Sequence, residues 1–176
     1  MAKYIISGGA TGIGAAIKHQ LRARGDTVII IDLKDGDYLV DLGDPSARQD
    51  VIARVGADHP EIDGLITCAG VASQFPQPDK ILQINYFGSV DLIEGLAPRI
   101  RPRGRIVAIS SNSAPMSTRA DLIDLLLDGD EAAAVAMGKT LHGHECYASS
   151  KNAIARYMRR KSPQLAHQGV SFNAIA

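Results

Sequence analysis

The sequence predicts an α/β fold in which a doubly wound parallel sheet is flanked by helices. Three observations support this fold class. Short runs of β-branched residues alternate with longer helical stretches along the chain. Residues 27–31 form a continuous β-branched run, typical of a strand buried on both faces. A glycine-rich turn directly follows the first run. At 176 residues we expect one folding unit, residues 1–176.

The expected strands are short apolar runs that end at glycine or polar residues. The first stops at Gly8, the third at Asp41, and the fourth is closed by Ala69-Gly70. The six expected strands cover residues 3–7, 27–31, 38–40, 64–68, 105–109 and 170–175.

The expected helices show apolar residues one helical turn apart and clear end signals. Ile13, Ile17 and Leu21 share one face of the first helix, which Gly25 is expected to end. Asp44 is expected to cap a second helix whose first residue is a proline. Further helices are expected over residues 79–96 and in the stretch after residue 147.

Composition argues against several classes of function. The 19 basic residues equal the 19 acidic ones and form no basic block, so nucleic-acid binding has little support. No apolar run is long enough to span a membrane, and the N-terminus lacks the apolar stretch of a signal peptide. Cys68 and Cys146 show neither metal-ligand spacing nor a disulfide framework. We therefore expect a cytoplasmic protein with reduced thiols and no nucleic-acid or membrane partner.

The turn after the first strand has the pattern of a dinucleotide site. Gly8, Gly12 and Gly14 lie between a strand and a helix, where the chain turns tightly and a pyrophosphate must approach the backbone closely. The helix N-terminus offers unpaired N–H groups to the phosphate. A glycine cluster alone is weak evidence, but its place between strand and helix strengthens it.

Asp32 indicates which dinucleotide is bound. It ends the second strand about 20 residues beyond the turn, where an acid can accept hydrogen bonds from the adenosine ribose. A carboxylate would repel the extra phosphate of NADP, and the turn contains no basic residue to bind it. Lys34 is a counter-argument, and a simple polar strand end is the alternative interpretation. We expect NAD as cofactor, with NADP less favoured.

Tyr147 and Lys151 are candidates for acid–base chemistry. They lie four residues apart on one face of a helix. A tyrosine with an ordinary pKa of about 10 is a poor acid–base group at neutral pH, but a cation one turn away favours the phenolate. Taken alone, the pair is better explained as an exposed tyrosine and an exposed lysine.

The order of motifs along the chain resembles that of the classical short-chain dehydrogenase/reductase family. The resemblance covers essentially the whole chain and implies a Rossmann-type fold. The family's Asn-Asn-Ala-Gly element is matched only at its second half, because Thr67 and Cys68 replace the two asparagines. The matching motifs are the glycine turn, Asp32, Cys68-Ala69-Gly70, Asn85, Ser110-Ser111 and Tyr147-Ala148-Ser149-Ser150-Lys151.

The resemblance implies a catalytic tetrad of Asn85, Ser111, Tyr147 and Lys151. Tyr147 would exchange the proton of the alcohol or carbonyl. Lys151 would lower the pKa of Tyr147 and hold the nicotinamide ribose. Ser111 would polarise the substrate oxygen. Asn85 would bend its helix and anchor a water that links Lys151 to solvent.

Two rival serines and a set of cofactor contacts complete the expected site. Ser110 and Ser113 compete with Ser111, which we prefer because it matches the second serine of the family's strand-end pair. Strand-end serines also often just satisfy local backbone groups. The residues implied to contact the dinucleotide are Gly8, Thr11, Gly12, Ile13, Gly14, Asp32, Leu33, Asp41, Leu42, Cys68, Ala69, Gly70, Tyr147 and Lys151.

A helical insertion departs from most family members. Thirty-six positions separate Ser111 from Tyr147, and the stretch at about 114–145 contains expected helices at 120–127 and 131–137. Together with Cys68-Ala69-Gly70 and Asn85-Tyr86-Phe87-Gly88, this insertion resembles that of the bacterial 3α-hydroxysteroid dehydrogenase/carbonyl reductase branch. The apolar face of Leu122, Leu125 and Leu126 is expected to alter contacts in a homodimer or homotetramer, or else to be a solvent-facing elaboration.

The end of the sequence is the second departure. Family members continue past Ala176 with a Pro-Gly turn and a substrate-covering loop, so the α/β domain is expected to be truncated at its C-terminal end. The chain is either part of a longer one or a fragment, and a fragment is expected to show weak or no turnover.

These features predict an NAD(H)-dependent oxidoreductase that interconverts a secondary alcohol and a ketone. A steroid or alicyclic substrate follows only from the resemblance to the branch. The alternative is a non-catalytic NAD-binding regulatory or interaction protein of the same fold, which usually lacks the tyrosine or the lysine. His142 and His144 have no evident third ligand, so no metal is expected.

Overall fold

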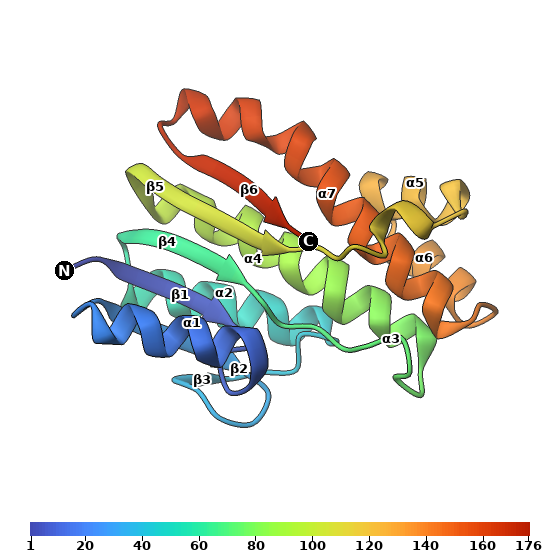
Figure 1. Ribbon diagram of the computed structural model, residues 1–176, viewed down its shortest axis with the longest axis horizontal. Helices are drawn as coiled ribbons and strands as arrows, with labels where there is room; N and C mark the ends of the chain where they lie inside the picture. The colour runs from blue at the N-terminus through green and yellow to red at the C-terminus, as the bar shows by residue number, and fades with distance from the viewer.

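The computed structural model describes residues 1–176 and confirms the doubly wound α/β fold class. One sheet has the order β3-β2-β1-β4-β5-β6, with every neighbouring pair parallel (Figure 1). The chain starts at the centre of the sheet and winds outward in both directions, so a crevice is expected beside β1 and β4. The strands are β1 (Lys3–Ser7), β2 (Thr27–Asp32), β3 (Tyr38–Leu39), β4 (Ile62–Thr67), β5 (Ile100–Ile109) and β6 (Ser171–Ile175).

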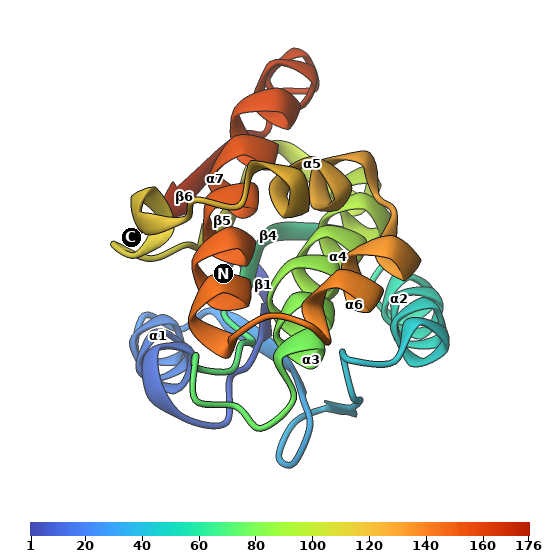
Figure 2. The same cartoon turned by 90° about the vertical axis from the view of Figure 1, so that its right-hand side faces the viewer.

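Helices cover both faces of the sheet, and Figure 2 shows α1 on the opposite side from α2, α3 and α4. Successive strand residues point to opposite faces, so Ile6 packs with Leu21 of α1 while Ile5 joins the larger core on the other face. No helix combines the length and hydropathy that crossing a bilayer requires. The helices are α1 (Gly12–Ala23), α2 (Pro45–Asp58), α3 (Pro78–Leu82), α4 (Gly88–Leu96), α5 (Ala120–Asp128), α6 (Glu131–Gly138) and α7 (Gly143–His167).

The expected helix at 79–96 is interrupted. A π-helical turn, Gln83–Phe87, separates α3 from α4, and Asn85 lies at its centre. The Asn85 amide donates to the Val71 carbonyl at 3.0 Å and its oxygen accepts from the Val71 N–H at 2.8 Å. Turns of this kind inside a helix are frequent at functional sites, because they re-aim a side chain.

Ile13, expected both on one helical face with Ile17 and Leu21 and in contact with the dinucleotide, is 61% exposed, whereas Leu21 is buried. It is the second residue of α1 and directly follows the glycine turn. Ile13 therefore faces a cavity and not the core.

The helices of the insertion, α5 and α6, form where the sequence places them, and Gly129 between them has a φ of +77°. Leu122 and Leu126 are fully buried in the main core of the same chain, and Leu125 packs against that core. The apolar face is thus packed within the chain and does not face solvent. The effect of the insertion on the assembly stays a prediction.

Candidate active site

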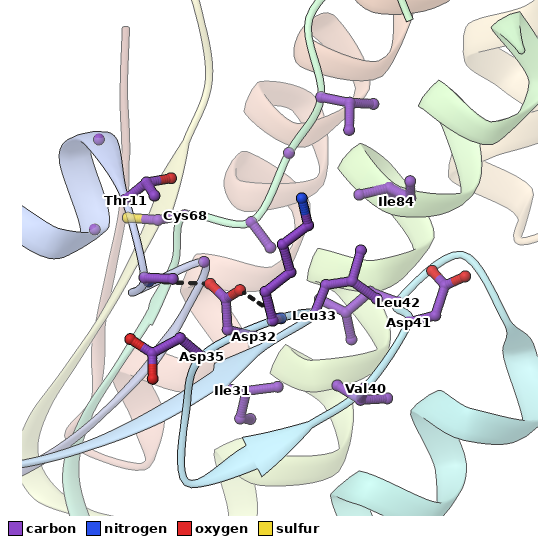
Figure 3. Close-up of a pocket in the computed structure, with 18 of the residues that line it drawn as sticks. Thr11, Ile31, Asp32, Leu33, Asp35, Val40, Asp41, Leu42, Cys68 and Ile84 are labelled. Atoms are coloured by element: carbon purple, nitrogen blue, oxygen red, sulfur yellow. Dashed lines mark hydrogen bonds between the residues drawn. The ribbon is translucent and has the colours of Figure 1, made fainter. Parts of the chain in front are cut away.

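A cavity of about 650 Å³ lies at the carboxyl ends of β1, β2 and β4. Figure 3 shows Asp32 and Leu33 entering it from the end of β2, Asp41 and Leu42 from the segment after β3, and Cys68 from the end of β4. Every residue predicted to contact the dinucleotide lines this cavity except Tyr147 and Lys151. We call it the dinucleotide groove.

The glycine turn is built by close backbone approaches. A Cβ on Gly14 would lie 2.1 Å from the Gly8 carbonyl oxygen, and one on Gly8 would lie 2.6 Å from the Ala69 Cα. Gly12 has a φ of +57° and no atom within 4 Å of an added Cβ, so its surface faces open space. Thr11 makes no side-chain capping bond to α1, which leaves the first N–H groups available to an anion. The turn therefore fits a pyrophosphate.

Acidic side chains dominate the far end of the groove. One Asp32 oxygen accepts from the Ala10 N–H at 3.0 Å and the other from the Lys34 N–H at 3.1 Å, which ties the glycine turn to the end of β2. Asp35 and Asp41 also line the groove, and Lys34 is its one cationic side chain. The local charge at this end is therefore negative.

Some groove residues were missed by the sequence analysis. Several of them adjoin predicted residues along the chain, so they could have been included by proximity alone. Val71 adjoins the predicted Gly70, whereas Ile84 reaches the groove from the π-helical turn, which Asn85 ties to the loop after β4. The missed residues are Ala10, Ile31, Lys34, Asp35, Val40, Val71 and Ile84.

Tyr147 and Lys151 project from the second and third turns of α7, but they differ in exposure. The Lys151 ammonium lies 5.8 Å from the centroid of the Tyr147 ring and donates to the Ile109 carbonyl at 2.9 Å. Lys151 is 5% exposed, and burial lowers its pKa to about 8, while the nearby Cys68 thiol acts weakly in the opposite direction. Tyr147 is half-buried. The interpretation of two exposed residues is therefore wrong for this pair.

Asn85 and Lys151 meet at Gly70. A Cβ on Gly70 would lie 3.2 Å from the Asn85 amide oxygen and 3.7 Å from the Lys151 ammonium. Glycine at this position lets both side chains approach the end of β4. Three of the four predicted tetrad residues, Asn85, Tyr147 and Lys151, are thus brought together from the π-helical turn and α7.

The three candidate serines have different surroundings. Ser110 is buried and donates to the Lys151 carbonyl at 2.9 Å, so it ties β5 to α7. The Ser111 hydroxyl oxygen accepts from the N–H of Ser113 at 3.1 Å and from its hydroxyl at 2.9 Å. Ser111 lines a second cavity together with Tyr147 and Ser113. These contacts favour Ser111 over Ser110 as the residue that faces a substrate.

Two further hydrogen bonds hold the segment after Ser111 against α7. The Asn152 amide donates to the Ala114 carbonyl at 2.8 Å, and the hydroxyls of Ser117 and Ser149 lie 2.8 Å apart. Sequence reasoning missed this function of these polar residues, because only the folded chain brings 114–117 beside 149–152.

The second cavity has a volume of about 470 Å³, and nine of its 13 lining residues are of polar or charged types. Arg119 is its one lysine or arginine, and the guanidinium is bound by Asp121 at 2.8 Å and Glu145 at 3.4 Å. Arg119 and a backbone N–H together lower the pKa of Asp121 to about 2. The cation on this wall is therefore already neutralised. His144 lines the same wall, and no third metal-binding side chain joins it and His142.

Comparison with known proteins agrees with this geometry. A family model described as short chain dehydrogenase matches residues 3–120. The chain is 33% identical to the 3-alpha-hydroxysteroid dehydrogenase/carbonyl reductase of Comamonas testosteroni, over 100% of this chain and 72% of that protein. It is 35% identical to the coniferyl-alcohol dehydrogenase of a Pseudomonas species, over 62% of this chain and 44% of that protein.

A solved structure supports the same relationship. The crystal structure of the 3-alpha-hydroxysteroid dehydrogenase from Pseudomonas sp. B-0831 complexed with NADH superposes with a TM-score of 0.94 and 34% identity, covering 99% of this chain and 71% of that one. The resemblance in the sequence, including that to the hydroxysteroid dehydrogenase branch, is confirmed. The chain therefore belongs to the short-chain dehydrogenase family of oxidoreductases.

Proposed function

We propose that this protein interconverts a secondary alcohol and a ketone with NAD(H), and that Tyr147 is the acid–base group. The observation that carries this proposal is the arrangement of Ser111 and Tyr147 on one cavity, with the Lys151 ammonium beside the tyrosine ring. Gly70 and Asn85 connect this corner to the dinucleotide groove. A bound nicotinamide would supply or accept the hydride.

Each side chain has a role that follows from its contacts. The Tyr147 hydroxyl gives a proton to the carbonyl oxygen, or removes one from the alcohol. Ser111 accepts two hydrogen bonds from Ser113 and donates a long one, 3.4 Å, to the Asn112 side-chain oxygen, and a substrate oxygen would take the place of that acceptor. Lys151, with a pKa of about 8, is mostly protonated at neutral pH, and its charge stabilises the phenolate that forms at Tyr147. Asn85 holds the loop after β4 through Val71.

The acidic end of the groove supports NAD as the cofactor. Asp32, Asp35 and Asp41 would repel the additional phosphate of NADP, and Lys34 alone does not balance them. The related Pseudomonas enzyme was solved with NADH, which agrees with this preference.

The substrate we propose is a neutral alcohol or ketone, steroid or alicyclic. The wall beside Tyr147 has no free cation for a phosphate or carboxylate, because Arg119 is paired with Asp121 and Glu145. Relatives named for hydroxysteroid and coniferyl alcohol substrates are in accord with this class. Cytoplasmic location, a homodimer or homotetramer, and a single domain with an insertion at 114–145 stay predictions.

The variant Tyr147→Phe tests the proposal, because it keeps the ring and removes the hydroxyl. We expect the rate of alicyclic or steroid alcohol oxidation to fall by about 10²- to 10⁴-fold, while NADH binding is retained. Steady-state rates and a fluorescence titration with NADH measure both. Equal turnover by the variant would eliminate Tyr147 as the acid–base group. NADH binding without turnover of any alcohol by the unmodified protein would favour the non-catalytic alternative.

A further inference from the structure

Arg48 is the largest side chain that is fully buried in this protein. It lies near the start of α2, outside the predicted catalytic and cofactor-binding residues, and is 1% exposed. A buried guanidinium requires partners for its charge and its donors, since its removal from water is otherwise strongly unfavourable. The hydrogen-bond partners of Arg48 therefore show which parts of the fold this buried charge links.

The Arg48 guanidinium joins three separate parts of the fold. Its Nε donates to Asp91 of α4 at 2.7 Å, and one terminal nitrogen donates to the Leu42 carbonyl at 2.9 Å. The other terminal nitrogen forms an ion pair with Glu131, the first residue of α6. Gln83 of the π-helical turn donates to the second Glu131 oxygen at 3.0 Å. The Glu131 carboxylate is thus fixed from two sides.

Leu42 connects this cluster to the dinucleotide groove. Residues 40–43 belong to no helix or strand, although Val40, Asp41 and Leu42 all line the groove. The Val40 N–H donates to the Asp32 carbonyl at 2.9 Å, which ties the start of this segment to β2. Beyond Val40, side chains bind the carbonyls of Leu42 and Gly43, with Arg48 on the Leu42 carbonyl and Lys80 on the Gly43 carbonyl at 3.0 Å.

We propose that Arg48 and Glu131 are positioning residues for the dinucleotide. Glu131 orients Arg48, Arg48 holds the Leu42 carbonyl, and the segment 40–42 is thereby kept at the spacing that the adenine side of the ligand requires. The inserted helix α6 thus contributes to dinucleotide affinity without touching the groove. This inference rests on the proposed function, because it takes NAD(H) as the occupant of the groove.

The variant Glu131→Gln tests the inference, since it removes the charge and retains the size of the side chain. We expect the Kd for NADH to rise by about 3- to 20-fold. Turnover at saturating dinucleotide should change far less, so the effect appears in KM for NAD and not in kcat. A purely structural role would lower the thermal midpoint without this selective change.

Glu94→Gln is the matched control. Glu94 pairs with Lys161 at 2.6 Å and accepts from the Tyr157 hydroxyl at 2.6 Å, and it joins α4 to α7 without contacting the groove. We expect a comparable shift in thermal midpoint and an unchanged Kd for NADH. An unchanged Kd in Glu131→Gln, or an equal rise in Glu94→Gln, would overturn the inference. Failure of the unmodified protein to bind NADH would instead overturn the proposed function.

Discussion

The dinucleotide groove is built differently from the proposed catalytic corner, which consists of Asn85, Ser111, Tyr147 and Lys151. The groove is formed by backbone at the ends of neighbouring strands, and its key contacts are close approaches of Gly8 and Gly14. The catalytic corner consists of side chains from the π-helical turn, the end of β5 and α7. Long-range hydrogen bonds such as that between Ser110 and the Lys151 carbonyl hold it together.

This difference predicts two kinds of sensitivity. Dinucleotide binding should weaken when atoms are added to the groove, because the backbone contacts of Gly8 and Gly14 leave no room for a Cβ. Turnover should fall when functional groups are removed from the catalytic corner, although the fold around them is retained. The following changes test this contrast in order of expected effect.

Ser111→Ala should give the largest change among them. Removing the hydroxyl that would bind the substrate oxygen is expected to lower kcat by about 10²- to 10³-fold, with an unchanged Kd for NADH. Steady-state kinetics and NADH titration provide the measurements. Ser110→Ala is the control, since Ser110 binds the Lys151 carbonyl and should affect stability more than chemistry. A larger kcat loss in Ser110→Ala would reverse the assignment of the two serines.

Comparison with Lys151→Met should measure how much the buried charge of Lys151 lowers the free energy of unfolding. The folded pKa of about 8 lies below the ordinary 10.5, so the unfolded chain binds more protons between these values. The burial penalty is therefore full below pH 8 and is relieved as pH rises toward 10.5. The unfolding free energy of the unmodified protein, relative to that of Lys151→Met, should rise by about 3 kcal/mol across this window.

Urea unfolding at several pH values measures this change. Lys139→Met is the control, because Lys139 is exposed and its replacement should leave the pH dependence unaltered. If the difference in unfolding free energy between the unmodified protein and Lys151→Met stays constant from pH 8 to 10.5, the pKa of Lys151 is not lowered.

Gly14→Ala should weaken dinucleotide binding by about 10- to 100-fold. The new Cβ would lie 2.1 Å from the Gly8 carbonyl oxygen, so the turn must open. NADH titration measures the effect, and Ala16→Val, which adds bulk at an exposed position of the same helix, should bind normally. If both variants bind as well as the unmodified protein, the groove does not depend on close backbone contact.

Asp32→Asn should produce the smallest change, a loss of about tenfold in the preference for NAD over NADP. The amide oxygen can still accept from the Ala10 N–H, so the bond to the glycine turn is kept, while the charge and the bond from the Lys34 N–H are lost. Comparison of Kd values for NADH and NADPH tests this. Asp35→Asn serves as the control for a charge lost elsewhere on the same groove. An identical shift in both variants would show that total charge, and not position, sets the preference.

The fold was predictable from local patterns. Strand β1 ends where Gly8 predicts, Asp44 caps α2 through the N–H groups of Ser46 and Ala47, and α5 and α6 appear within the expected insertion. The π-helical turn at Asn85 was not visible in the periodicity, because a single extra residue per turn leaves the apolar pattern almost unchanged. Spacing placed Ile13 on a helical face with Leu21, but it does not show which residues of that face the sheet covers.

The sequence by itself determined the fold class and the glycine turn, since both depend on residue type and short-range spacing, while the four predicted tetrad residues follow from the resemblance to the short-chain dehydrogenase family. Only the tertiary structure decided that Ser111 and Ser113, and not Ser110, line the cavity with Tyr147, that Lys151 is buried, and that Arg48 links the inserted α6 to the groove. These features depend on contacts between residues far apart along the chain. Neither the spacing of residues nor the composition shows which side chains far apart along the chain come into contact once the sheet has formed.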